Sequence, residues 1–191
     1  MKNRRSVRRG FTLIELMVAV ALIAIMLALA APSLTTFQRN AELTTATNTL
    51  LSAINAARGE AMKRGRYAMV VPADTANWSS GWIVFVDMNR TQAFDSTIDI
   101  ALMTKEAPPP YLTITGNNTA TGTAPYIMFD ASGYSKTKAG GFGALAFTIA
   151  RNDVAASQLA EQTRRLIISS TGRARTCKPA TDTTCGASSS Q

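Results

Sequence analysis

Residues 11–31 read FTLIELMVAVALIAIMLALAA, and Thr12 and Glu15 supply the only polar side chains in this stretch. From Leu16 onward the run is entirely apolar. At about 1.5 Å per residue, a helix of this length spans about 30 Å, which matches the hydrocarbon core of a bilayer. We therefore expect residues 11–31 to form a membrane-spanning helix.

The formal charge of +8 is unevenly distributed along the chain, which has 20 Lys and Arg residues against 12 Asp and Glu residues. Five of the bases precede the apolar stretch without any acid: Lys2, Arg4, Arg5, Arg8 and Arg9. The rest of the chain therefore has fifteen bases against twelve acids, a surplus of +3. By the positive-inside rule, the basic cluster places the N-terminus in the cytoplasm and the remainder beyond the inner membrane.

Two ordinary interpretations also fit this N-terminal region. A basic start, an apolar segment and the small-residue triplet Ala28-Leu29-Ala30 are typical of a cleaved secretory signal that would release a soluble domain. A plain single-pass anchor is the other. Glu15 fits neither well, because an ionised carboxylate inside a membrane costs about 2.5–3.5 kcal/mol or more and marks a function.

The string Gly10-Phe11-Thr12-Leu13-Ile14-Glu15, followed by an apolar helix and Pro32, resembles the class III signal of type IV pilins and pseudopilins. The resemblance implies that prepilin peptidase cuts between Gly10 and Phe11 and that Phe11 is then N-methylated. It also implies that Glu15 guides assembly with other pilins, where it neutralises the terminal amine of a neighbouring subunit. Pro32 removes one backbone hydrogen bond and should kink the helix.

Beyond Pro32 an amphipathic stripe predicts that the helix continues to Arg64, with Gly65 as its C-cap. The periodicity then changes to that of short strands separated by turn residues. We predict seven strands: Arg66–Val71, Trp82–Asp87, Ile98–Met103, Tyr111–Thr115, Tyr126–Phe129, Ala144–Ala150 and Arg164–Ser169. The predicted fold is α+β, a type IV pilin-like arrangement with a leader at 1–10, a long helix at 11–64 and a β-rich head at 65–191 packed on the C-terminal half of that helix.

Three further stretches resemble GspH/FimT-type minor pilins. Residues 51–65 resemble the end of the long helix in that family, and residues 78–87, with Trp78 and Trp82, resemble a characteristic strand. Residues 128–133 resemble a characteristic turn. The resemblance implies a structural minor pilin, without enzymatic activity, that is incorporated into a type IV pilus near its tip. The alternative is a GspH-like pseudopilin of a type II secretion system.

Cys177 and Cys185 are the only cysteines, and the stretch between them is polar and contains Pro179. A head outside the cytoplasmic membrane lies where disulfides persist, so we expect these two cysteines to pair. We expect the tail at 186–191 to be disordered.

The segment just before Cys177 is basic and begins with a glycine. Gly172, Arg173 and Arg175 resemble the GRxR motif of FimT-type pilins that bind DNA during natural transformation. Double-stranded DNA is therefore one expected partner, bound through guanidinium–phosphate contacts. Other cations nearby could extend the patch: Lys178, Arg164 and Arg165. The plain alternative is a solvated turn whose arginines serve solubility or contacts between pilins.

Enzymatic activity is not expected from this sequence. The absence of histidine excludes Ser-His-Asp chemistry and zinc-histidine or haem-histidine sites, and two cysteines cannot form a zinc site alone. We expect no cofactor and no metal. The expected partners are prepilin peptidase, the membrane, other pilins and DNA, and the expected location is the inner membrane first and then the periplasm, the pilus or the cell surface.

Overall fold

The computed structural model describes residues 10–74 and 76–186, with the backbone but not the side chains of residues 28–33. Helix α1 (Leu13–Arg64) ends at Gly65, whose φ of 64° lies in the left-handed region. The Arg66 amide donates to the carbonyl of Ala61 across 3.2 Å, as in a Schellman cap. The predicted end of the helix is therefore confirmed.

Some predictions concern parts of the chain that the structure does not describe. The leader lies outside the described residues except for Gly10, and so do residues 187–191 of the predicted tail. Helix α1 continues through Pro32, but the Pro32 side chain is not described, so the kink stays a prediction. In the described part of the chain, no helix is long and apolar enough to count as a membrane span, and the predicted span is unconfirmed.

The chain divides into two compact units, Met1–Asn40 and Ala41–Gln191. The second unit, which we call the head, contains the C-terminal half of α1 together with all the strands. Leu43, Leu50 and Ile54 on that half of the helix are completely buried in one hydrophobic core with strand residues. From Leu43 onward the amphipathic stripe is thus the face that packs on the strands, as predicted, whereas its first two members, Leu34 and Phe37, are exposed.

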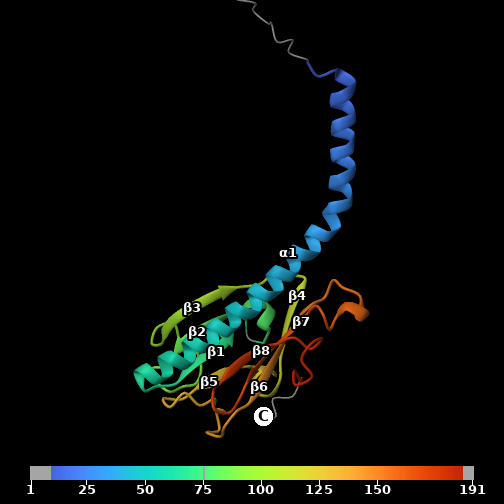
Figure 1. Cartoon of the computed structure of the whole chain (residues 1–191). Helices are drawn as coiled ribbons and strands as arrows, with labels where there is room; N and C mark the ends of the chain where they lie inside the picture. The colour runs from blue at the N-terminus through green and yellow to red at the C-terminus, as the bar shows by residue number, and fades with distance from the viewer. Residues whose placement is uncertain (1–9, 75, 187–191) are drawn as a thin grey trace, which may run out of the picture. The chain divides into compact units, whose positions relative to one another are not determined.

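Two four-stranded antiparallel sheets form the rest of the head, and Figure 1 shows the C-terminal half of α1 running across them. The first sheet has the order β3 (Ile100–Glu106), β2 (Gly81–Val86), β1 (Ala68–Pro72), β5 (Ile127–Phe129). The second has the order β4 (Leu112–Gly116), β6 (Leu145–Arg151), β7 (Thr163–Ile168), β8 (Ala174–Cys177). Three short 3-10 helices, Trp78–Ser80, Asn118–Ala120 and Ala156–Gln158, lie in the connections.

Both tryptophans fill the core rather than a surface site. Trp78 and Trp82 are almost completely buried, and the Trp78 indole donates to the carbonyl of Ala120 at 2.9 Å. The Trp78 ring meets Phe147 edge to face, with 4.8 Å between the ring centroids. This contact joins the connection between β1 and β2 of the first sheet to β6 of the second, so Trp78 packs the two sheets together.

All seven predicted strands are present, but the ends of each differ from the predicted ones by up to three residues, and the structure adds an eighth strand. The third predicted strand begins at Ile100 instead of Ile98, because the Asp99 carboxylate accepts the amides of Met88 and Asp95 and holds the preceding chain in a loop. An eighth strand, β8, was not predicted. Its sequence ARTC lacks the alternation of apolar and polar residues that indicates a strand, and it forms by pairing with β7 at the sheet edge.

Candidate functional site

The N-terminal motif forms the first turn of α1. Thr12 precedes the helix, and its hydroxyl accepts the amide of Glu15 at 3.3 Å. The Glu15 carboxylate in return accepts the amide of Thr12 at 3.4 Å, which completes a capping box. Sequence reasoning missed this pair, although the spacing Thr-x-x-Glu is a recognised helix-start pattern. In a single chain, Glu15 therefore stabilises its own helix start.

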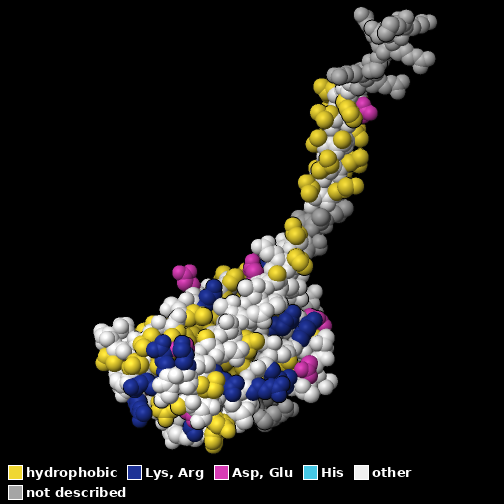
Figure 2. Space-filling view, turned by 60° about the vertical axis from the view of Figure 1, so that its left-hand side comes forward, with side chains coloured by type: hydrophobic (Ala, Val, Ile, Leu, Met, Phe, Trp, Pro, Cys, Tyr) yellow, Lys and Arg dark blue, Asp and Glu magenta, His cyan; other side chains and the backbone are white. Residues whose placement is uncertain are grey.

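The apolar residues that follow Glu15 are uncovered in the single chain. Phe11 is 86% exposed, and the large hydrophobic side chains of residues 13–27 are all more than half exposed. Figure 2 shows hydrophobic side chains around this part of the helix. A helix that is apolar on every side is stable only when lipid or other protein covers it. We therefore expect this segment to be covered by lipid or by other protein, since the described residues leave it exposed.

The second candidate site is the hairpin between β7 and β8. The Gly172 amide donates to Ser169 O and the Ser169 amide donates to Arg173 O, which closes a three-residue loop. Gly172 has a φ of 79°, and a Cβ there would lie 1.9 Å from the carbonyl oxygen of Gly133. The glycine of the predicted GRxR motif is therefore required by the fold, because it lets two loops of the head touch.

Arg58 of α1 joins the same two loops. Its Nε donates to Gly133 O at 2.9 Å, and its Nη2 lies 3.4 Å from Thr171 O. Because these partners are 75 and 113 residues away in the sequence, no local pattern could identify the role. The Arg58 guanidinium fixes the position of the basic hairpin on the helix.

The disulfide predicted from the sequence is present between Cys177 and Cys185, with 5.8 Å between the Cα atoms. It closes a loop in which the Asp182 carboxylate accepts the hydroxyl and the amide of Thr184, at 2.7 and 2.8 Å. These hydrogen bonds, together with the charge of Arg175, hold the pKa of Asp182 below its usual value. The loop is therefore closed both covalently and by an ionised carboxylate.

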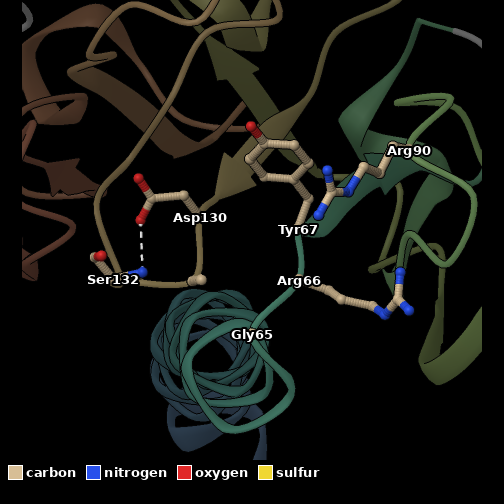
Figure 3. Close-up of a pocket in the computed structure, with 7 residues that line it drawn as sticks. Gly65, Arg66, Tyr67, Arg90, Asp130 and Ser132 are labelled. Carbon is tan, nitrogen blue, oxygen red and sulfur yellow. Dashed lines mark hydrogen bonds between the residues drawn. The ribbon is translucent and has the colours of Figure 1, made fainter.

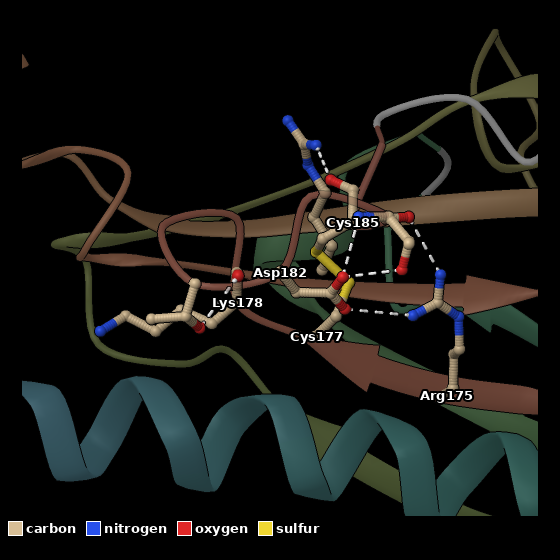
Figure 4. Close-up of polar contacts among 8 residues, drawn as sticks. Arg175, Cys177, Lys178, Asp182 and Cys185 are labelled. Carbon is tan, nitrogen blue, oxygen red and sulfur yellow. Dashed lines mark hydrogen bonds and ion pairs between the residues drawn. A yellow bond between two sulfur atoms is a disulfide. The ribbon is translucent and has the colours of Figure 1, made fainter.

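Arg175 is engaged by this loop, whereas Arg173 is not. Arg175 Nη1 lies 3.4 Å from Asp182 Oδ2, and its Nη2 donates to Thr184 O at 3.1 Å, as Figure 4 shows. Arg173 is exposed, and no described residue forms a hydrogen bond or an ion pair with its guanidinium. Of the two arginines of the predicted motif, Arg173 is thus exposed, whereas Arg175 is half-buried.

The other predicted cations lie in two different places. Arg165 is opposite Cys177 in the pairing of β7 with β8, on the same sheet face as Arg175, and it donates to Cys185 O. Arg164 is on the other face, toward α1, where it lines a cavity of about 230 Å³ with Lys178 and three polar helix residues, Thr44, Thr47 and Asn48. Lys178 forms an ion pair with Glu161. The six predicted residues are therefore not one continuous patch.

A second hollow lies at the end of α1 and is shown in Figure 3. Its volume is about 200 Å³, and Arg66, Tyr67, Arg90 and Asp130 line it. Arg66 donates to Met88 O at 2.9 Å, and Asp130 accepts the amide of Ser132 at 2.9 Å. These polar groups hold the surrounding turns in place. Within the described ranges, no group of three or more His, Cys, Asp or Glu residues could hold a metal ion.

Comparison with known proteins relates this geometry to a family. The model of the family described as type II transport protein GspH matches residues 46–172, and that of the prokaryotic N-terminal methylation motif matches residues 5–31. The first match covers most of the head and the second covers the motif around Glu15. No match to a curated protein was found.

Solved structures resemble this chain at low sequence identity, and the FimU structures share its fold. The type IV minor pilin FimU of Pseudomonas aeruginosa matches with a TM-score of 0.56 at 20% identity, over 75% of this chain and 94% of that one. A second crystal form of FimU gives 0.53 at 19% identity, over 72% and 94%. The minor pseudopilin EpsH from the type 2 secretion system of Vibrio cholerae gives 0.49 at 13% identity, over 72% and 98%.

Three observations agree: the C-terminal half of a long helix packs on two antiparallel sheets, the N-terminal motif is present, and the family model matches residues 46–172. The chain therefore belongs to the GspH family of type II transport proteins.

Proposed function

We propose that this chain is a minor pilin, cut by prepilin peptidase between Gly10 and Phe11, N-methylated at Phe11 and incorporated into a type IV pilus near its tip. The observation that carries the proposal is the exposed apolar segment of α1, which has a glutamate in its first turn. In the inner membrane, lipid covers residues 11–31 as a single-pass anchor, and in the filament the same surface packs on the helices of other pilins.

The chemistry of Glu15 fits this transfer from lipid to protein. Cutting after Gly10 removes five cationic side chains and leaves a positive amine on Phe11. Within a bundle of helices, the Glu15 carboxylate of one subunit neutralises the amine of its neighbour, and the low dielectric constant strengthens that attraction. Subunits packed out of register would leave both charges buried and unpaired, which is costly. Glu15 therefore selects the assembled register.

A pseudopilin of a type II secretion system is the second structural candidate, since members of this family take that role as well. The disulfide-closed loop and the exposed Arg173 favour the pilus, because they provide a stable basic surface on the head. In neither case does the chain act as an enzyme. Deleting the chain in a strain that has both systems distinguishes them: loss of pili with normal secretion supports the pilus.

The first experiment determines the N-terminus of the mature protein. Intact mass of membrane-extracted protein should correspond to a chain that begins at Phe11 with one added methyl group. A soluble chain that begins at Ala31 would contradict the proposal and favour an ordinary secretory signal. Gly10→Val should block the cut and leave the full-length chain in the membrane, because prepilin peptidase cuts after this glycine in type IV pilins.

The second experiment separates the two roles of Glu15. Glu15→Gln removes the charge but keeps an acceptor for the Thr12 amide, whereas Thr12→Ala weakens the helix cap, at a cost of about 0.5–2 kcal/mol, and keeps the charge. If pairing with a neighbouring amine directs assembly, Glu15→Gln is processed normally but depleted from sheared pili, and Thr12→Ala is incorporated. Equal incorporation of Glu15→Gln and wild type would contradict the pairing.

DNA binding by the head is a second candidate function, and the observation that favours it is the exposed Arg173 on a rigidly positioned hairpin. Figure 2 shows Lys and Arg side chains gathered on the viewed face of the head. Arg173 supplies a guanidinium for a phosphate, and Arg165 lies on β7 opposite Cys177, at the far end of β8. Contacts of this kind favour double-stranded DNA of any sequence and support a role in natural transformation.

A further inference from the structure

We propose that the head also has a base-stacking surface made by Tyr134, Phe142, Lys136 and Lys138, and that it therefore binds single-stranded or frayed DNA more tightly than intact duplex. We call these four residues the aromatic patch. The proposal rests on the second candidate function, DNA binding beside Arg173, and goes beyond it by naming the form of DNA that is preferred.

The aromatic patch is built on a small hairpin that follows β5. Lys136 pairs with Phe142 in an antiparallel bridge, and the Gly143 amide donates to Ser135 O at 2.9 Å. Residues paired directly across two strands share one face, and so do residues two apart on one strand. Tyr134, Lys136 and Phe142 therefore lie on the same face of this hairpin.

The two aromatic rings are exposed together. Phe142 is 63% exposed and Tyr134 is 41% exposed, with 5.5 Å between the ring centroids and an angle of 65° between the ring planes. Large aromatic residues usually gain stability by burial. Two neighbouring rings held in a fixed geometry at the surface offer π faces to a partner that can stack, and every nucleobase has such a face.

One lysine contacts Phe142, and a second lysine lies two residues further along the same hairpin. Lys136 Nζ lies 4.1 Å from the centroid of Phe142 and 4.0 Å from Asp130 Oδ2, so its charge is partly compensated. Lys138 is exposed, lies over the ring of Tyr126 at 4.8 Å and forms no ion pair with the described residues. Alternation of cations with exposed rings matches the alternation of phosphates and bases along a single strand.

The aromatic patch is continuous with the basic hairpin. The Ser135 amide donates to Ser170 O at 3.1 Å, three residues before Arg173. The Arg58 contacts with Gly133 O and Thr171 O hold the same two loops together. A strand whose phosphates contact Arg173 would therefore place its next bases beside Tyr134 and Phe142. In an intact duplex the bases are paired and stacked inside, so only the phosphate contacts remain.

The test compares three DNA probes on the full chain in detergent: an oligothymidylate, an abasic strand of the same length and charge, and a duplex. Stacking on one base should make oligothymidylate bind at least about fivefold more tightly than the abasic strand. Replacing both rings, Tyr134→Ala with Phe142→Ala, should abolish this difference and leave the affinity for the abasic strand unchanged. Leu159→Ala, which removes a similarly exposed apolar side chain elsewhere, is the matched control.

Single substitutions distinguish stacking from apolar contact. Phe142→Trp should preserve the preference for oligothymidylate, and Phe142→Leu should reduce it. Equal affinity for oligothymidylate and the abasic strand would overturn the stacking proposal and leave phosphate binding by Arg173 intact. Absence of binding to all three probes would overturn both. If pilus assembly fails in the Phe142 variants while the preference for oligothymidylate is absent, the aromatic patch contacts protein instead, and the proposal is wrong.

Discussion

Replacing Asp182 with asparagine should strengthen DNA binding by the head, because it removes the carboxylate that now faces Arg175. The two side chains are each about one-third exposed, at 31% for Arg175 and 34% for Asp182, and their closest oxygen and nitrogen are 3.4 Å apart. Asparagine keeps an oxygen that can accept from Thr184, so the loop closed by the disulfide is retained. The substitution therefore frees one guanidinium charge for a phosphate.

The expected magnitude follows from counterion release. Each phosphate contact adds about −0.9 to the slope of log affinity against log salt, so raising salt from about 50 to 200 mM costs about 3.5-fold per contact. Asp182→Asn should steepen the slope by about 0.9, and Arg173→Gln should make it shallower by about 0.9. Arg175→Gln should change the slope less than Arg173→Gln does, because Asp182 already compensates the charge of Arg175.

Fluorescence anisotropy with a labelled duplex, repeated across that range of salt, measures these slopes. Lys105→Gln is the matched control, since it removes one exposed cation from β3 in the other sheet. An unchanged slope in Asp182→Asn would refute the reasoning, and so would equal losses in Arg173→Gln and Arg175→Gln. A loss in Lys105→Gln as large as that in Arg173→Gln would show that total charge, rather than position, determines binding.

Three further outcomes are expected. Gly172→Ala should lower the free energy of unfolding by at least about 1–3 kcal/mol, since alanine disfavours the positive φ and its Cβ would collide with a carbonyl oxygen, and chemical denaturation measures the loss. Cys177→Ser with Cys185→Ser should lower it by about 2.5 kcal/mol, the entropy of closing nine residues, and an unchanged denaturation midpoint would contradict this. Hydrogen bonds from Thr184 and the charge of Arg175 lower the pKa of Asp182 in the folded protein. The Asp182 carboxylate therefore compensates Arg175 fully above the usual pKa of about 3.9, and this compensation is lost only as pH falls through the lower folded pKa. Wild type and Asp182→Asn should differ in salt slope at about pH 5 and converge only in stronger acid.

A glycine control separates the two causes of the Gly172 effect. Gly140 also has a positive φ, 90°, but nothing lies within 4 Å of the position that a Cβ would take. Gly140→Ala therefore reports backbone strain alone. If Gly172→Ala and Gly140→Ala destabilise the protein equally, contact between the two loops contributes nothing measurable to stability.

The parts of the molecule that depend on neighbouring residues were predictable from the sequence. The helix end at Gly65, the strands with regular alternation and the pairing of two cysteines eight residues apart all follow from local chemistry. The motif around Glu15 is equally local, since its residues lie within one helical turn. The capping box with Thr12 could have been read from the same spacing.

Only the tertiary structure decided which charges are available and which side chains meet. Strand β8 exists because β7 offers it an edge, and its own four residues carry no pattern that predicts it. The disulfide-closed loop then places Asp182 beside Arg175, and the packing of the second sheet on the helix turns Arg164, rather than Arg165, toward α1. Arg58 meets loops that are 75 and 113 residues away. A count of charges in the sequence gives their number, but the partner of each guanidinium depends on contacts between distant segments, which form only when the sheets pack on the helix.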